Sequence, residues 1–199
     1  QVKALFVKTA EVFGRVDILL NNAGQATSGT ILTLDLAHYR RVLELNVFGV
    51  LYAMKVAVPY MKERGGVIIN VSSMVAFLNI PFISHYASTK YAMSNISHTA
   101  RIEFKPYDIR VVTLYPGMTA TDLYTNVLSN EGAPKMPAMK SDSAEFVARK
   151  ILKAVRKEPR DMYMSFSYRF QVIFARLFPG FLDNVIGKGA MKQAGSETR

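Results

Sequence analysis

The sequence contains no cysteine and no tryptophan. Without cysteine the chain can form no disulfide, no thiolate metal site and no thiol nucleophile. The lack of disulfides suits a reducing compartment, so we expect a cytoplasmic protein. No apolar run reaches the roughly 20 residues that span a bilayer, and no signal-peptide pattern is present. The sequence begins with Gln1 rather than Met, and we therefore expect residues upstream of it.

Acidic residues are also scarce, since 15 Asp and Glu face 25 Lys and Arg, which gives a net charge of +10. Such a charge could attract nucleic acid, an acidic membrane surface or an anionic ligand. The basic residues are spread along the chain, with some crowding over Arg149–Arg160. Nucleic-acid binding requires a clustered basic patch, so we expect no nucleic-acid partner. The histidines and carboxylates show no metal-binding spacing, and we expect no metal.

Apolar residues alternate between two patterns, which predict helices and buried strands in turn. The short apolar runs predict strands over Val16–Gly24, Gly65–Ser73, Ile109–Gly117 and Asp161–Phe166. Helical spacing predicts helices over Val2–Phe13, Leu34–Met61, Tyr86–Phe104 and Ala144–Lys157, with Asp35 as one N-cap and Asp142 paired with Glu145 in another. Strands separated by helices indicate an α/β fold with a parallel sheet covered on both faces.

One stretch, Ile69–Ala92, brings reactive side chains into register. Tyr86 and Lys90 stand four residues apart on a predicted helix, so they share one face. A cation beside a phenol favours the phenolate and lowers its pKa. Ser73 ends the preceding strand, at the edge of the sheet where ligands bind in open α/β folds. Ser72 is the alternative, because neighbouring residues of a strand point to opposite faces.

Four motifs in one order make the chain similar to a known family. They are Asn21-Asn22-Ala23-Gly24, Asn46 within LELNVFG, Ser73 with Tyr86 and Lys90, and Pro116-Gly117 followed by Thr119 and Thr121. With these motifs the chain resembles the short-chain dehydrogenase/reductase (SDR) family. The resemblance implies a Rossmann-like, doubly wound parallel sheet, an NAD(P)-dependent oxidoreductase and a homo-oligomer.

The resemblance also implies roles for single residues. Tyr86 would be the general acid/base, and Lys90 would lower its pKa and bind the nicotinamide ribose. Ser73 would hold the substrate oxygen, and the backbone carbonyl of Asn46 would bind a water of a proton relay. These four are the predicted catalytic residues. The predicted cofactor-binding residues are Asn22, Ala23, Gly24, Tyr86, Lys90, Pro116, Gly117, Thr119 and Thr121.

The chain departs from the family at its start. Family members open with a strand and a glycine-rich turn, T-G-x-x-x-G-x-G, which binds the cofactor's pyrophosphate at a helix N-terminus. This sequence lacks that motif, the first strands and the residue that distinguishes NAD from NADP. We therefore expect an N-terminally truncated member that uses NAD or NADP, with a slight preference for NADP. The alternative is a truncated, catalytically inactive SDR-like protein that acts by association.

The predicted substrate site is apolar, which suits a hydrophobic alcohol or ketone. Its residues are Ser73, Met74, Val75, Phe82 and Tyr86, with Phe77, Ile83 and Tyr115 nearby, and Met118–Lys140 forms a lid. We divide the chain into a partial dehydrogenase domain, residues 1–165, and an amphipathic C-terminal tail, residues 166–199, which is part of that domain or an appendage. Residues 166–186 could cap the site, pack in a dimer or make peripheral contact with a membrane.

Overall fold

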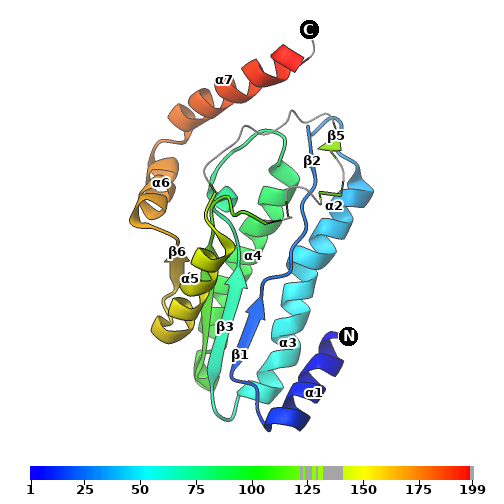
Figure 1. The fold of residues 1–199 in the computed structure, drawn as a ribbon, viewed down its shortest axis with the longest axis vertical. Coiled ribbons are helices and arrows are strands. Elements are labelled where there is room, and N and C mark those ends of the chain that lie inside the picture. The colour runs from blue at the N-terminus through cyan, green and yellow to red at the C-terminus, as the bar shows by residue number, and fades with distance from the viewer. Residues whose placement is uncertain (122, 124–126, 129, 132–140, 198–199) are drawn as a thin grey trace.

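The computed structural model describes residues 1–197 except 122, 124–126, 129 and 132–140. Its centre is a four-stranded sheet of β1 (Ile18–Asn21), β3 (Gly66–Val71), β4 (Ile109–Tyr115) and β6 (Asp161–Tyr163). The strands lie in the order β1-β3-β4-β6, and every neighbouring pair is parallel (Figure 1). The predicted α/β fold with a parallel sheet is confirmed. Part of the predicted lid Met118–Lys140 lies outside the described residues.

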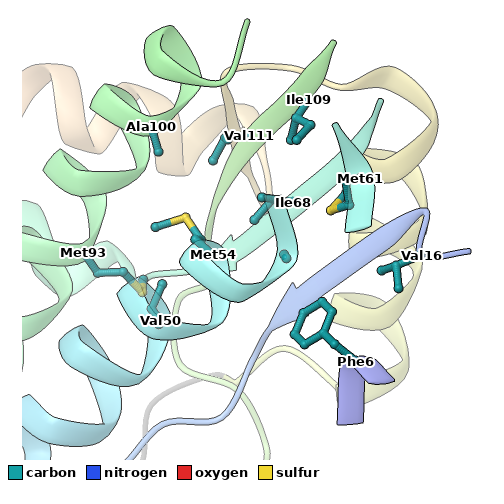
Figure 2. Packing of buried hydrophobic residues seen from close by; sticks show 11 residues of the cluster. Phe6, Val16, Val50, Met54, Met61, Ile68, Met93, Ala100, Ile109 and Val111 are labelled. Atoms are coloured by element: carbon teal, nitrogen blue, oxygen red, sulfur yellow. The ribbon is translucent and has the colours of Figure 1, made fainter. Parts of the chain in front are cut away.

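Alternate residues of the central strands enter two separate cores, as the two-residue period of a strand requires. Ile68, Ile109 and Val111 pack on one face against the helices α1 (Val2–Phe13), α3 (Gly49–Met61) and α4 (Ser84–Glu103), around Met54 and Met93 (Figure 2). On the other face the strands contribute Val67, Ile69, Val71, Val112 and Leu114, which pack against Val147 and Ala154 of α5 (Ala144–Lys157). The two central strands, β3 and β4, are therefore buried on both faces.

The helices begin and end close to the predicted positions. They are α1 (Val2–Phe13), α2 (Leu36–Leu43), α3 (Gly49–Met61), α4 (Ser84–Glu103), α5 (Ala144–Lys157), α6 (Phe166–Leu177) and α7 (Pro179–Glu197). Asp35 caps α2 as predicted, since its carboxylate accepts a hydrogen bond from the Ala37 amide at 2.6 Å. A π-helical turn, η1 (Glu44–Phe48), joins α2 to α3, so the predicted helix is continuous but irregular. Such turns frequently lie at functional sites.

Two predicted boundaries were wrong. The N-cap of α5 is Ser143, whose hydroxyl accepts from the Phe146 amide at 3.1 Å, and not Asp142. The Asp142 backbone instead bonds Met118 and Ala120, which fixes the turn before the helix. Strand β6 ends at Tyr163, and Phe166 is the first residue of α6 rather than the end of a strand.

The stretch Leu36–Met61 is long and apolar enough to cross a membrane by length and composition alone. In the fold, Val50, Met54 and Met61 of this stretch are buried in the core against the sheet. A core helix of a globular domain passes the same test of length and composition, and this stretch packs one of its faces against the sheet. The shorter elements are β2 (Ser28–Gly29), β5 (Asn130–Glu131) and the 3-10 helices η2 (Met74–Phe77) and η3 (Lys105–Tyr107).

Candidate active site

A cavity of about 700 Å³ opens beyond the carboxyl ends of β1, β3 and β4, where ligands bind in open α/β sheets. It brings together ten of the predicted site residues, which come from four separate segments of the chain. They are Asn22, Ala23, Gly24, Ser73, Tyr86, Lys90, Pro116, Gly117, Thr119 and Thr121. Motifs that are far apart in the sequence therefore line the same cavity.

Tyr86 and Lys90 project from the first turns of α4, which buries both side chains. The Lys90 ammonium lies 5.8 Å from the centre of the Tyr86 ring and donates a hydrogen bond to Val71 O at 3.0 Å. Burial lowers the pKa of Lys90 from 10.5 to about 8, because the charged form loses its hydration. The ammonium is therefore still mostly protonated at pH 7, and a positive charge stands beside the phenol.

Asn46 lies behind the cavity wall rather than in it and is fully buried. Its side-chain amide forms two hydrogen bonds with the backbone of Gln25. It accepts from Gln25 N at 3.0 Å and donates to Gln25 O at 2.9 Å. It also donates to Thr89 Oγ1 at 3.0 Å, which ties η1 to α4. The π-helical turn thus allows one asparagine to hold both the loop after β1 and the helix of Tyr86.

The two serines after β3 have different partners. The Ser72 hydroxyl lies 2.8 Å from Ser94 Oγ and 3.0 Å from Lys90 O, so it is used to attach the strand to α4. Among the described residues, the hydrogen bonds of the Ser73 hydroxyl are long: it donates to Pro116 O at 3.5 Å and accepts from the Val75 amide at 3.3 Å. Both line the cavity, but the Ser73 hydroxyl is the one that a ligand oxygen could engage at little cost.

The turn Pro116–Gly117 closes the cavity beyond β4. Pro116 O accepts from the Met74 amide at 2.8 Å, which joins this turn to η2. Gly117 has no room for a side chain, because a Cβ there would lie 2.7 Å from the Tyr168 hydroxyl of α6. Tyr168 in turn donates to Asp142 Oδ2 at 3.3 Å. Helix α6 therefore packs directly against one wall of the site.

Some predicted substrate residues lie elsewhere. Met74 is buried and Val75 and Phe82 are half-buried, and none of the three is among the described residues that line this cavity. Tyr115 is fully buried between Phe77 and Tyr163, so it is a core residue. Several other lining residues were not predicted from the sequence, namely Leu20, Gln25, Leu45, Val71, Ala144, Val147, Ala148 and Ile151, whereas Leu123 belongs to the predicted lid. Val147 and Ile151 could have been found, since they are apolar residues four positions apart on the helix predicted over Ala144–Lys157.

The cavity has features that fit a ligand rich in hydroxyl groups, such as the ribose of a dinucleotide. An ammonium group has three N–H donors, and Val71 O is the acceptor that the described part of the chain supplies to Lys90. Gly24 keeps the space beside this ammonium open, since a Cβ there would lie 3.4 Å from Lys90 Nζ. The residues present therefore fit the ribose and nicotinamide part of such a cofactor.

Comparison with known proteins gives a consistent result. The family model of the short chain dehydrogenases matches residues 1–132. The uncharacterized oxidoreductase YusZ of Bacillus subtilis (strain 168) is 37% identical over 153 residues, which are 76% of this chain and 54% of that protein. The chain thus spans about half the length of this curated relative.

Solved structures share the fold. A short chain dehydrogenase from Burkholderia cenocepacia J2315 in complex with NADP superposes with a TM-score of 0.77 at 25% identity, covering 92% of this chain and 74% of that one. A short chain dehydrogenase/reductase from Burkholderia phymatum in complex with NAD has a TM-score of 0.78 at 20% identity, with 91% and 72% of the two chains covered. The second likeness supports the fold alone.

Proposed function

This chain belongs to the short-chain dehydrogenase family, and on that premise we propose that the protein is an NAD(P)-dependent oxidoreductase. It interconverts a hydroxyl and a carbonyl group on a hydrophobic substrate, with Tyr86 as general acid/base. One observation carries the proposal: Tyr86, Lys90 and Ser73 meet the Asn22–Gly24 and Pro116–Gly117 turns around a single cavity.

In the proposed reaction the nicotinamide, when bound, supplies or accepts the hydride. The Tyr86 hydroxyl gives its proton to the carbonyl oxygen, and in the reverse direction the Tyr86 phenolate takes a proton from an alcohol. Lys90 places a protonated ammonium 5.8 Å from the Tyr86 ring and favours the phenolate. The Ser73 hydroxyl, whose hydrogen bonds to Pro116 O and the Val75 amide are long, hydrogen-bonds the reacting oxygen and stabilises charge there.

The proposal assigns the other predicted residues to the cofactor and the substrate. Asn22, Ala23 and Gly24 border the ribose with Lys90, and Pro116, Gly117, Thr119 and Thr121 meet the nicotinamide amide. The Asn46 carbonyl binds the water of the relay. Contacts of the substrate with Met74, Val75 and Phe82 are part of the prediction, and the apolar lining by Leu20, Leu45, Val71, Leu123, Val147 and Ile151 supports a hydrophobic substrate.

The proposal also covers the form of the cofactor, the oligomeric state and the cellular location of the protein. NADP is the proposed form of the cofactor, as in the Burkholderia cenocepacia enzyme. A homo-oligomer is supported by exposed apolar side chains along η1, α3 and α4, namely Leu45, Phe48, Leu51, Tyr52 and Tyr91. The proposed location is cytoplasmic with peripheral membrane contact, which rests on the exposed side chains of residues 166–186.

The test uses the complete protein that contains this chain, with NADPH or NADH added and nicotinamide fluorescence recorded. We expect enhanced fluorescence on binding and turnover with apolar ketones or alcohols. Tyr86→Phe should keep cofactor binding and lower turnover by about 100- to 10,000-fold, the usual contribution of a general acid/base. Tyr91→Phe removes a hydroxyl from an exposed position of the same helix and is the matched control.

Two results would oppose the proposal in different ways. An unchanged rate in Tyr86→Phe would refute the mechanism while leaving the activity intact. No binding of either cofactor by the complete protein would favour the inactive SDR-like protein that acts by association.

A further inference from the structure

An exposed apolar face runs along α6 and α7. Its members are Phe166, Phe170, Ile173, Leu177, Phe178, Phe181 and Val185, which are 46–82% exposed. We call these seven residues the tail face. Phe166, Phe170, Ile173 and Leu177 follow one another at intervals of three or four residues, so they form one stripe of α6. The stripe lies opposite Val172 and Ala175, which are buried against the fold.

The tail face is an organised surface that continues from one helix to the next. Phe174 lies 4.9 Å from Phe178 and 6.0 Å from Phe181, measured between ring centres, so aromatic contacts join α6 to α7 across the Pro179 break. Figure 1 shows α7 extending away from the rest of the chain beyond α6. A contiguous apolar surface of this kind marks a binding site for a protein or a membrane.

The charges around the tail face are mainly positive. Among the side chains that the structure describes on α6 and α7, Arg169, Arg176 and Lys188 are exposed cations and Asp183 is an exposed carboxylate. Aromatic and aliphatic side chains flanked by Arg and Lys are the composition of segments that lie in the interface of anionic membranes.

We propose that the tail face docks on the surface of a membrane that contains anionic lipids. The positive surroundings favour this occupant over a second copy of the chain, because two like faces would bring arginines toward arginines. The seven side chains would enter the boundary between headgroups and acyl chains, and the arginines would contact lipid phosphates. The other face of α6 meets the site through Tyr168, so docking would hold the cavity close to the membrane surface.

The test measures co-sedimentation of the complete protein with vesicles. One set of vesicles is pure phosphatidylcholine and the other contains one quarter phosphatidylglycerol. We expect binding to the anionic vesicles that is at least tenfold stronger than to the neutral ones and that falls at high salt. The variant Phe170→Gln/Leu177→Gln should lower binding to anionic vesicles at least tenfold. Neither residue belongs to the proposed cofactor or substrate site.

The matched control is Leu5→Gln/Ile102→Gln, which changes two side chains of similar exposure on α1 and α4 and should bind like the parent protein. Circular dichroism verifies that both variants fold. Equal vesicle binding by parent and tail-face variant would overturn the proposal, and so would equal binding to neutral and anionic vesicles. A dimer that sediments without lipid and is lost in the tail-face variant, with no vesicle binding, would assign the face to a second copy instead. Vesicle binding requires no turnover, so failure here is distinguishable from failure of the proposed reaction.

Discussion

The buried ammonium of Lys90 should make the chain less stable than a variant without it. Burial lowers the Lys90 pKa from 10.5 to about 8, and at about 1.4 kcal/mol per pH unit this corresponds to roughly 3 kcal/mol. Replacing Lys90 by Met removes this cost at pH 7, and it leaves Val71 O without its bond from Nζ, which costs about 1 kcal/mol. We therefore expect Lys90→Met to raise the free energy of unfolding by about 2 kcal/mol at pH 7.

The gain should depend on pH, and its sign follows from proton linkage. Between pH 8 and 10.5 the unfolded chain keeps the Lys90 proton while the folded chain has released it. The unfolded state then binds more protons, so the stability of the parent chain rises with pH over this range. The Met variant lacks this contribution. The difference in free energy of unfolding between the Met variant and the parent chain should therefore shrink above pH 8. It should vanish near pH 10, because there the loss of the hydrogen bond to Val71 O offsets what remains of the gain.

Urea unfolding followed by far-UV circular dichroism, at pH 7 and at pH 10, measures both effects without a tryptophan signal. Lys55→Met is the control, since Lys55 is an exposed lysine in the middle of α3 and should change stability by little at either pH. If Lys90→Met is destabilising by the same amount at both values of pH, then burial does not penalise the ammonium, and the reasoning from desolvation is refuted.

Three further predictions concern stability and are measured by the same urea titration. Asn46→Ala removes the three hydrogen bonds of a fully buried side chain and should lower the free energy of unfolding by about 2–4 kcal/mol. Gly65→Ala should lower the free energy of unfolding by more than about 2 kcal/mol, because Gly65 has φ +72° and a Cβ there would lie 2.6 Å from Asp108 O. Gly180→Ala is its control and should be neutral or stabilising, since a Cβ at Gly180 would have nothing within 4 Å. Ser94→Ala should lower the free energy of unfolding by about 1 kcal/mol, since Ser94 Oγ no longer donates to Lys90 O at 2.7 Å.

The sequence predicts the regular elements well because their signals are local. The bounds of α1 and α5 match the structure, since each helix is marked by apolar spacing and by residues at its ends. The N-cap of α5 shows the limit of such signals. Asp142 and Ser143 are both good caps, and the choice is made by contacts of the Asp142 backbone with Met118 and Ala120, more than twenty residues away.

In the candidate site, too, local signals are readable from the sequence and long-range contacts are not. Tyr86 and Lys90 share a helix face by spacing alone, and the cavity contains both. Asn46 is predicted as a site residue from its motif, but its π-helical turn and its hydrogen bonds to Gln25 depend on a contact 21 residues distant. Tyr115 is predicted near the pocket as one of its apolar and aromatic residues. Its burial depends on α6 and Tyr163, and no pattern around Tyr115 encodes where those segments pack.

One wall of the cavity is fixed by hydrogen bonds and the opposite wall is formed by apolar side chains. The residues of the proposed reaction therefore differ from those that could select the substrate. On one side, hydrogen bonds between side chains and backbone fix α4 and the loop after β1, through Asn46 and the Ser72–Ser94 pair. Such contacts tolerate little change, because a buried polar group without a partner is costly. On the other side, Val147 and Ile151 of α5 meet the cavity with apolar surface alone. Exchange of one apolar side chain for another there alters size and shape while leaving every hydrogen bond of the Tyr86–Lys90 pair in place, so substrate range can change on α5 without a change in mechanism.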